Sequence, residues 1–211
     1  MTRHPIRCNH GKFVGRCEQC TVRFFQEEYW VDGWALDAYT NRNGKTLYGE
    51  LINISKYQLK NDPLLAAAKA LPLLVGMKGF LTKMYPVAYR PFDCLVYPPS
   101  NQDRKFQLTQ FIGDGLATSK ILNRSREITK IHPHSTVKTM SGKERFVTLP
   151  HTMNVVPDAS RAKPKGILVF DDVLETGNTA KEVCRALEEA WPGVPRYYVA
   201  LTYLMDWKGG K

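Results

Sequence analysis

The sequence has little that would mark a secreted or membrane-spanning protein. Its N-terminus is polar and carries cysteines where a secretion signal needs an apolar segment. The longest apolar stretch, residues 64–77, is interrupted by Lys69, Pro72 and Gly76, and it is shorter than the roughly 20 residues that cross a bilayer. Five cysteines in 211 residues do not indicate a disulfide framework. We therefore expect a cytoplasmic protein that does not insert into a membrane.

Acidic residues are scarce relative to basic ones. The chain has 20 Asp and Glu against 30 Lys and Arg, which gives a net charge of +10. The excess is concentrated in residues 1–25 and 101–165. Such a charge predicts an anionic partner, either a phosphorylated small molecule or nucleic acid. A basic surface that only keeps the protein soluble explains the charge equally well.

Four side chains near the N-terminus have the spacing of a metal site. Cys8, His10, Cys17 and Cys20 follow the pattern C-x-H-x6-C-x2-C. Four nitrogen and sulfur ligands predict a closed, structural Zn²⁺ site, and the metal would supply folding energy to a segment poor in apolar residues. A redox-active CxxC pair and unrelated free thiols are the alternatives, and His4 is an alternative to His10 as a ligand.

The middle of the chain combines aromatic residues with one long helical pattern. Residues 22–60 contain several Phe, Tyr and Trp, and residues 31–34 and 43–44 predict turns between short strands or loops that face a partner. Asp62 and Pro63 predict the start of a helix that continues to about residue 84. The aromatic side chains would pack a small core, stack a base or stack single-stranded DNA.

Strands and helices alternate in the C-terminal part of the chain. Strands are predicted at residues 92–97, 128–131, 167–170 and 197–204, with helices at residues 102–122 and 177–190, whereas residues 133–165 predict a long mobile loop. This order predicts an α/β fold with a parallel sheet. In such sheets ligands bind outside the carboxyl ends of the strands, where the loops after residues 97 and 170 would meet.

Residues 167–179 are the most specific feature of the sequence. Four apolar residues lead into Asp171 and Asp172, and a polar loop precedes the next helix. That loop consists of Glu175, Thr176, Gly177, Asn178 and Thr179. Free N–H groups at a helix start favour a phosphate, and adjacent carboxylates can accept hydrogen bonds from ribose hydroxyls. The segment therefore predicts a sugar-phosphate site; the alternative is a strand, turn and helix that bind nothing.

This segment resembles the phosphoribosyl diphosphate (PRPP) loop of type I phosphoribosyltransferases, in which four apolar residues precede two acids, an apolar pair and Thr-Thr-Gly-x-Thr. Glu175 stands where that motif has its first Thr. The chain as a whole resembles the ComF family of competence-type proteins, through its N-terminal cysteines, residues 45–57, and the segments 97–100, 104–107 and 116–117. Lys105 replaces a Gly of the family, and His10 stands among ligands that are usually Cys.

The resemblance implies a type I phosphoribosyltransferase fold, a parallel sheet flanked by helices. Its parts would be a zinc-binding knuckle (residues 1–25), an aromatic and helical hood (26–90) and a phosphoribosyltransferase-like domain (91–211). It implies PRPP or another phosphoribosyl ligand, with Asp171 and Asp172 on the ribose hydroxyls and on Mg²⁺ through water. The remaining assignments are 5′-phosphate binding by residues 175–179, diphosphate binding by Ser100, Arg104 and Lys105, and closure over the leaving group by Lys138, Lys143 and Arg145.

Three functions follow from these expectations. The chain transfers phosphoribose to a nitrogen acceptor, or it is a non-catalytic accessory that handles single-stranded DNA or a DNA-processing protein, or it senses PRPP without turnover. The basic charge, the metal knuckle and the aromatic residues favour the second function, and Glu175 favours the two non-catalytic ones. The sequence leaves the acceptor and the oligomeric state open.

Overall fold

The structure is a computed structural model that describes residues 21–26, 29–41, 43–59, 61–100, 104–131 and 152–204. The predicted zinc ligands Cys8, His10, Cys17 and Cys20 lie outside these residues. The loop cations Lys138, Lys143 and Arg145 lie outside them as well.

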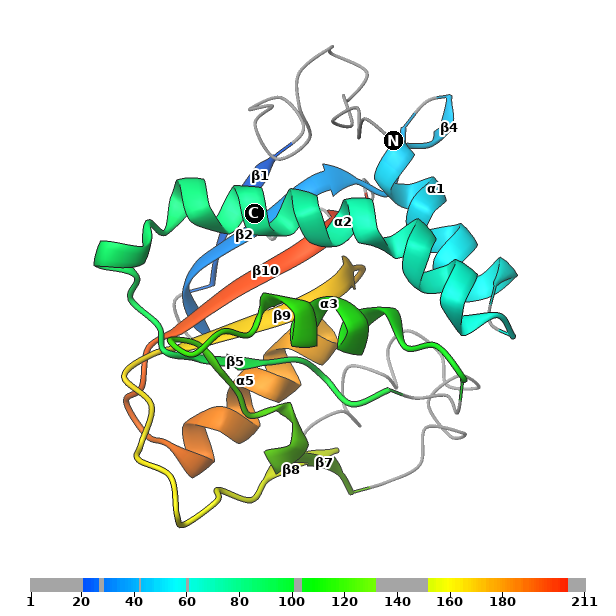
Figure 1. Ribbon diagram of the computed structural model, residues 1–211. Helices are drawn as coiled ribbons and strands as arrows, with labels where there is room; N and C mark the ends of the chain where they lie inside the picture. The colour runs from blue at the N-terminus through cyan, green and yellow to red at the C-terminus, as the bar shows by residue number, and fades with distance from the viewer. Residues whose placement is uncertain are drawn as a thin grey trace.

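The centre of the fold is a six-stranded sheet with the order β1-β2-β10-β9-β5-β6 (Figure 1). Strand β1 pairs antiparallel with β2, and every other neighbouring pair in this sheet is parallel. The predicted α/β class with a parallel sheet is confirmed. The strands are β1 (Val22–Gln26), β2 (Trp30–Ala38), β5 (Cys94–Val96), β6 (Leu122–Asn123), β9 (Ile167–Leu174) and β10 (Arg196–Tyr203).

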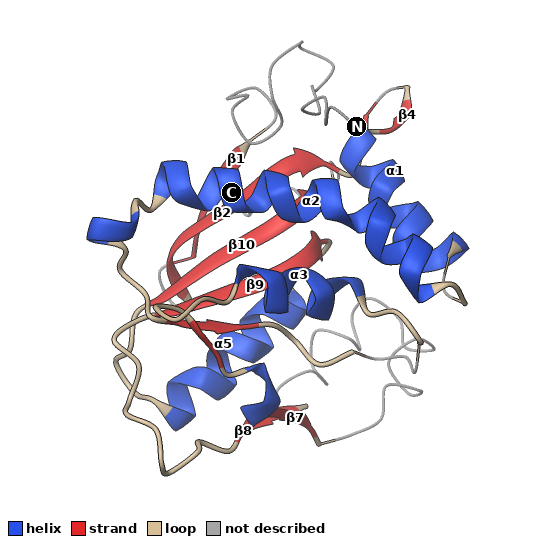
Figure 2. Cartoon of the chain, viewed as in Figure 1, coloured by secondary structure: helices blue, strands red, loops and turns tan. Residues whose placement is uncertain are grey.

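Helices cover both faces of this sheet (Figures 1 and 2). One face carries α1 (Leu47–Asn53), the π-helix η1 (Ile54–Gln58), α2 (Pro63–Met84) and α3 (Leu108–Leu116). The other face carries α5 (Asn178–Ala190) and a small antiparallel pair, β7 (Ile128–Lys130) and β8 (Met153–Val155). The remaining elements are β3 (Thr40–Asn41), β4 (Gly44–Lys45), η2 (Val87–Tyr89) and η3 (Ser125–Glu127).

Strand β9 is buried on both faces, which explains its unbroken apolar start. Leu168 and Phe170 belong to the core beneath α1, α2 and α3, whereas Ile167 and Val169 belong to the core beneath α5. A parallel strand covered on both sides has apolar residues at every position instead of at alternate ones. The sequence therefore located this strand correctly from its composition.

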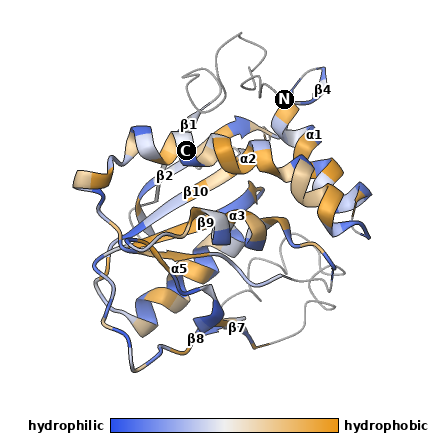
Figure 3. Cartoon of the chain, viewed as in Figure 1, coloured by the Kyte–Doolittle hydropathy of each residue, from blue (hydrophilic) through white to orange (hydrophobic). Residues whose placement is uncertain are grey.

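Helix α2 begins and ends where the sequence predicted. Asp62 caps it, because its carboxylate accepts a hydrogen bond from the Leu65 N–H at 3.0 Å. Hydrophobic residues recur along the whole helix (Figure 3). By length and composition α2 could cross a membrane, so the expectation from the shorter apolar run is wrong on length. A core helix of a soluble protein, which is mostly buried, passes the same test; of the most apolar stretch of α2, 39% is buried here.

Residues 31–34, predicted as a turn, are the middle of β2. Both edges of β2 are paired, with β1 on one side and β10 on the other, and this pairing overrides the local turn signal of Asp32 and Gly33. Asp32 accepts hydrogen bonds from Arg23, Trp34 and Tyr85. Strands β1 and β2, which precede residue 90, belong to the same sheet as β5, β6, β9 and β10.

Three other elements differ from the prediction. Among the described residues of the helix expected at 102–122, only α3 is helical. It ends early because the Thr118 hydroxyl accepts hydrogen bonds from the N–H groups of Lys120 and Ile121 and turns the chain toward β6. Strand β8 lies inside the expected loop at residues 133–165. It was not predicted because three residues are too few to show the alternating pattern of a strand. Strand β9 does not end at Phe170 but continues for four residues, because β10 remains paired with it as far as Leu174.

Two glycines give a matched test of the packing of α1. A Cβ on Gly49 in α1 would lie 1.9 Å from the carbonyl oxygen of Tyr39, whereas a Cβ on Gly79 in α2 would meet nothing within 4 Å. We expect Gly49→Ala to lower the free energy of unfolding by about 1–3 kcal/mol. Gly79→Ala should raise it by about 0.5–1 kcal/mol, since alanine favours the helix. Guanidinium denaturation measures both, and shifts of the same sign would contradict the close approach at Gly49.

Candidate functional site

A cleft of about 580 Å³ opens at the carboxyl ends of β5 and β9. The pairing of β9 with β5 ends at Val169, whereas its pairing with β10 continues to Leu174. The chain after β5 runs to α3 on one face, and the chain after β9 runs to α5 on the other. Connections that leave neighbouring strands for opposite faces create a crevice, which is where open α/β sheets bind ligands.

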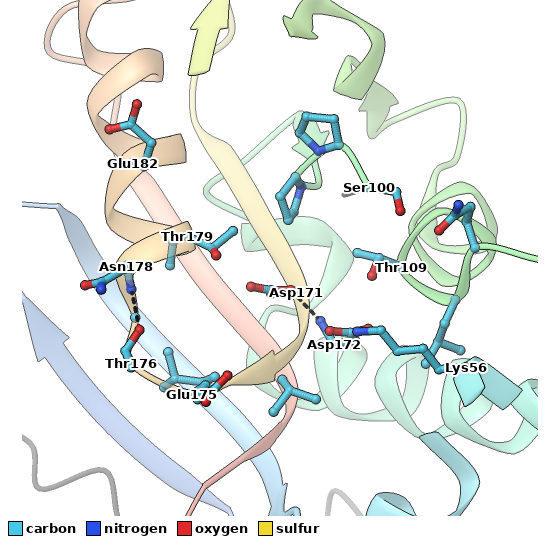
Figure 4. A pocket seen from close by; sticks show the side chains of 18 of the residues that line it. Lys56, Ser100, Thr109, Asp171, Asp172, Glu175, Thr176, Asn178, Thr179 and Glu182 are labelled. Atoms are coloured by element: carbon cyan, nitrogen blue, oxygen red, sulfur yellow. Dashed lines mark hydrogen bonds and ion pairs between the residues drawn. The ribbon is translucent and has the colours of Figure 1, made fainter. Parts of the chain in front are cut away.

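Most of the residues predicted for a ligand site lie together in this cleft. The lining includes Ser100, Arg104, the acid pair and all of residues 175–179. Figure 4 shows the acid pair between the turn at the start of α5 and the side chain of Lys56. Lys105 is exposed and does not line the cleft, unlike its neighbour Arg104.

The two acids are buried within β9. Asp171 and Asp172 are 9% and 4% exposed. The backbone N–H of Asp172 donates to Oδ1 of Asp171 at 2.8 Å. Burial raises the pKa of Asp171, the charge of Asp172 raises it further, and the charge of Lys56 opposes this shift. The pair therefore shares a site in which two full negative charges are unfavourable without a cation.

Lys56 supplies that cation. Its Nζ donates to Oδ2 of Asp172 at 2.5 Å, across 116 residues of sequence. Burial lowers the pKa of Lys56, but the charge of Asp172 and the hydrogen bond to it outweigh burial, so the pKa is raised and the side chain stays an ammonium. No role was predicted for Lys56 from the sequence, although Lys56 and Tyr57 formed one part of the family resemblance.

Arg104 ties Lys56 and Tyr57 to the opposite wall of the cleft. Its Nη1 donates to the carbonyl oxygen of Lys56 at 2.7 Å. Its guanidinium carbon lies 4.9 Å from the centre of the Tyr57 ring, within the range of a cation–π contact. The residue predicted to hold a diphosphate therefore also fixes the π-helix that carries Lys56.

The turn before α5 forms the other side of the acid pair. Gly177 has a φ of 76°, a conformation that side chains other than glycine rarely adopt, and it precedes the first helical residue. No side chain caps the helix at Gly177. The hydroxyl of Thr176 accepts from the Asn178 N–H at a long 3.4 Å. The side chain of Glu175 is exposed. These features leave the first turn of α5 suited to an anion.

The hairpin of β7 and β8 forms a third wall. The sequence predicted β7 as a strand at residues 128–131 but predicted neither β8 nor the place of the pair in the cleft. The carboxylate of Glu182 in α5 accepts from the Met153 N–H at 2.9 Å, and Arg185 donates to the Met153 carbonyl at 2.7 Å. An ion pair of 2.8 Å joins Glu182 to Arg185. Lys130 is the partner of Met153 across the hairpin and lines the cleft. Burial lowers the pKa of Lys130 to about 8.

The acid pair does not fit a divalent cation held directly by the protein. Asp172 is already bonded to an ammonium, and one oxygen of Asp171 accepts a backbone hydrogen bond. Within the described part of the chain, no three His, Cys, Asp or Glu side chains gather as metal ligands would. Hard cations need several oxygen ligands from protein, water or substrate, so a Mg²⁺ ion here would depend on oxygens of a ligand.

No protein-family model matches the chain. No curated protein matches it either. Among solved structures, the chain is similar to the Helicobacter pylori xanthine-guanine-hypoxanthine phosphoribosyltransferase, with 16% sequence identity, a TM-score of 0.42, and coverage of 68% of this chain and 78% of that one. A likeness of this size assigns neither a ligand nor a reaction to this chain.

Neutralising the two acids one at a time should change the free energy of unfolding in opposite directions. Because the pKa of Asp171 is raised by folding, its ionisation lowers stability as the pH rises through that pKa. At pH values above the raised pKa of Asp171, the Asp171→Asn variant should therefore be more stable than the wild type by about 1 kcal/mol. The difference should disappear at acidic pH, where Asp171 is protonated in both the folded and the unfolded wild type. Asp172→Asn leaves the ammonium of Lys56 without its partner and should cost about 1–3 kcal/mol.

Denaturation at several pH values measures both effects. The pair of variants is its own control, because each replaces one buried carboxylate by an amide on the same strand. Equal destabilisation by both variants would mean that Lys56 does not distinguish between the two acids.

Proposed function

We propose that this chain is a phosphoribosyltransferase-like protein that binds PRPP or another 5′-phosphorylated pentose. One observation carries the proposal: the buried acid pair and the uncapped turn before α5 face the same cleft. A parallel sheet with helices on both faces is compatible with the type I phosphoribosyltransferase fold. The cleft lies at the carboxyl ends of the strands, where that architecture binds ligands.

Each part of the cleft suits one part of such a ligand. Asp171 and Asp172 would accept hydrogen bonds from the ribose hydroxyls. The N–H groups of residues 175–179 and the positive end of the α5 dipole would hold the 5′-phosphate. The exposed side chain of Glu175 can point into solvent, so its charge does not have to lie beside the phosphate.

A diphosphate group would lie toward the opposite wall. Ser100 and Arg104 line that side, and Lys130 adds a third polar group from β7. Arginine suits this role because its planar guanidinium can donate two parallel hydrogen bonds to a phosphate. Lys105 is left out of the binding set because it does not line the cleft.

If the protein is an enzyme, its reaction is transfer of phosphoribose to a nitrogen acceptor with diphosphate as the leaving group. The residues would act by holding the sugar and by stabilising charge on the leaving oxygens, so a strong general base is not required. A divalent cation enters this proposal only as a companion of the diphosphate of the ligand.

The finer assignment, a ComF-type protein, rests on the sequence resemblance. It includes a structural Zn²⁺ at Cys8, His10, Cys17 and Cys20, a place in single-stranded DNA uptake or processing, and a cytoplasmic location. The buried, unpaired thiols of Cys94 and Cys184 are compatible with a reducing compartment.

Calorimetry with PRPP, ribose 5-phosphate and AMP tests the proposal. The wild type should bind at least one of them, and the double variant Asp171→Ala with Asp172→Ala should bind it at least about 100-fold more weakly, since two charge-assisted contacts are lost. Asp158→Ala, which removes an exposed acid outside the cleft, is the control. Absence of binding to all three compounds contradicts the proposal. Binding of PRPP without its consumption would favour the sensor over the enzyme.

A second candidate function, binding of single-stranded DNA, is favoured by a basic cavity at the other end of the strands from the cleft. This cavity of about 350 Å³ is lined by Arg90, Lys120 and Lys165, and it contains one carboxylate, that of Asp93. Its residues precede β5, β6 and β9, so it lies at the amino ends of the strands. The ring of Tyr89 is 86% exposed beside Arg90 and could stack a base.

Fluorescence anisotropy with a labelled single strand tests this candidate. Replacing Arg90, Lys120 and Lys165 by Ala should weaken binding and reduce the slope of log K against log salt by about 2. A control that replaces Lys69, Lys78 and Lys83 of α2 removes the same charge elsewhere. Equal weakening by both triple variants would show that the total charge matters and not this cavity.

A further inference from the structure

We propose that Lys56 is the resident cation of the acid pair. Its ammonium neutralises Asp172 and takes the place that a protein-held divalent cation would need, so the sugar is bound without a metal ion at the carboxylates. This inference rests on the proposed function, because it concerns how the same cleft holds the pentose. It adds a residue that reaches the site from η1, an element outside the PRPP-loop motif.

The contact between the two side chains is short and sheltered. Nζ of Lys56 lies 2.5 Å from Oδ2 of Asp172, and the two side chains are 28% and 6% exposed. The charge of Asp171 also attracts the ammonium. A buried carboxylate without a partner is unfavourable, so the ion pair with Lys56 compensates for the burial of Asp172 in the sheet.

The backbone holds Lys56 in this position. It lies in the π-helix Ile54–Gln58, and π-helical turns are frequent at functional sites. The carbonyl oxygen of Lys56 accepts from Arg104 at 2.7 Å, and the adjacent Tyr57 ring lies against the same guanidinium. The backbone of Lys56 is therefore anchored from the opposite wall of the cleft, at a position from which its side chain reaches Asp172.

A metal ion at the acids would have to displace this ammonium. A divalent cation and an ammonium on one carboxylate repel each other, and the repulsion is strong where water is excluded. Asp171 already accepts a backbone hydrogen bond. Ribose 5-phosphate, which has no diphosphate, should therefore bind equally well with and without Mg²⁺, whereas PRPP brings its own metal-binding oxygens.

An ammonium also has donors that a metal ion lacks. Lys56 has three N–H groups, of which one is directed to Asp172. The others can donate to a ribose hydroxyl oxygen when the hydroxyl donates to a carboxylate. Lys56 would thus position the sugar as well as balance charge, and arginine should replace it better than an uncharged side chain of similar length.

The first experiment needs no ligand and follows Mn²⁺, a paramagnetic substitute for Mg²⁺, by water proton relaxation. The wild type and Lys56→Arg should show no binding at the acids below about 1 mM. Lys56→Met keeps the apolar stem, exposes the acids and should bind Mn²⁺ at least about tenfold more tightly. Only binding that Asp172→Asn abolishes is counted, which removes any contribution from other metal sites.

The second experiment measures the affinity for ribose 5-phosphate in EDTA and in Mg²⁺. For the wild type the two values should agree within about twofold. For Lys56→Met the affinity should fall about tenfold in EDTA and recover in Mg²⁺, a rescue that a merely structural lysine would not show. Wild-type binding that requires Mg²⁺, or a Lys56→Met affinity unchanged in EDTA, would overturn the inference.

The two experiments separate the two proposals. If the wild type binds none of PRPP, ribose 5-phosphate and AMP, the proposed function fails, while Mn²⁺ binding still decides whether Lys56 excludes a metal. Thermal unfolding shows whether Lys56→Met is folded. If it is not, the wild type and Lys56→Arg decide: Mn²⁺ binding at Asp172 in either one overturns the inference, and its absence in both supports it.

Discussion

The burial of two adjacent carboxylates in the middle of a sheet is the constraint on which the rest of the structure depends. Charged oxygens at this depth are stable only with a cation or with several hydrogen bonds. Lys56 provides the cation for Asp172, and the backbone provides a donor for Asp171. The π-helix must therefore lie over β9, and Arg104 keeps it there through the carbonyl oxygen of Lys56. The packing of η1 against the sheet and the geometry of the acid pair therefore depend on each other.

The unequal lengths of the strands create the space that this arrangement needs. Strand β5 stops pairing at Val169 of β9, whereas β10 supports β9 as far as Leu174. The acids are consequently held on a rigid strand and yet face an open crevice. Gly177 then turns the chain into α5, and Glu182 of that helix fixes the edge of the β7–β8 hairpin through Met153. Regular elements hold three walls of the cleft, which favours precise placement of a ligand.

Local signals predicted a large part of this architecture. The cap at Asp62 and the apolar start of β9 located α2 and the central strand, and the acids and the loop at residues 175–179 located one wall of the cleft. The same signals failed at β2, where Asp32 resembles a turn residue but is bonded to three side chains from other positions. Lys130 lies in a predicted strand, but nothing in the sequence placed it at the cleft, because its partner strand β8 stands in a segment without periodicity.

The sequence by itself determined the features that neighbouring residues decide: the helix cap at Asp62, the buried apolar run of β9, the polar loop before α5 and the adjacency of the two acids. Tertiary structure alone decided that Lys56 meets Asp172 across 116 residues, that β9 extends past the acids, and that Lys105 lies outside the cleft while Arg104 lies inside it. The physical reason is the sequence separation over which each kind of interaction acts. Caps and turns are fixed by hydrogen bonds within a few residues, whereas strand ends and ion pairs depend on which distant segments become buried together.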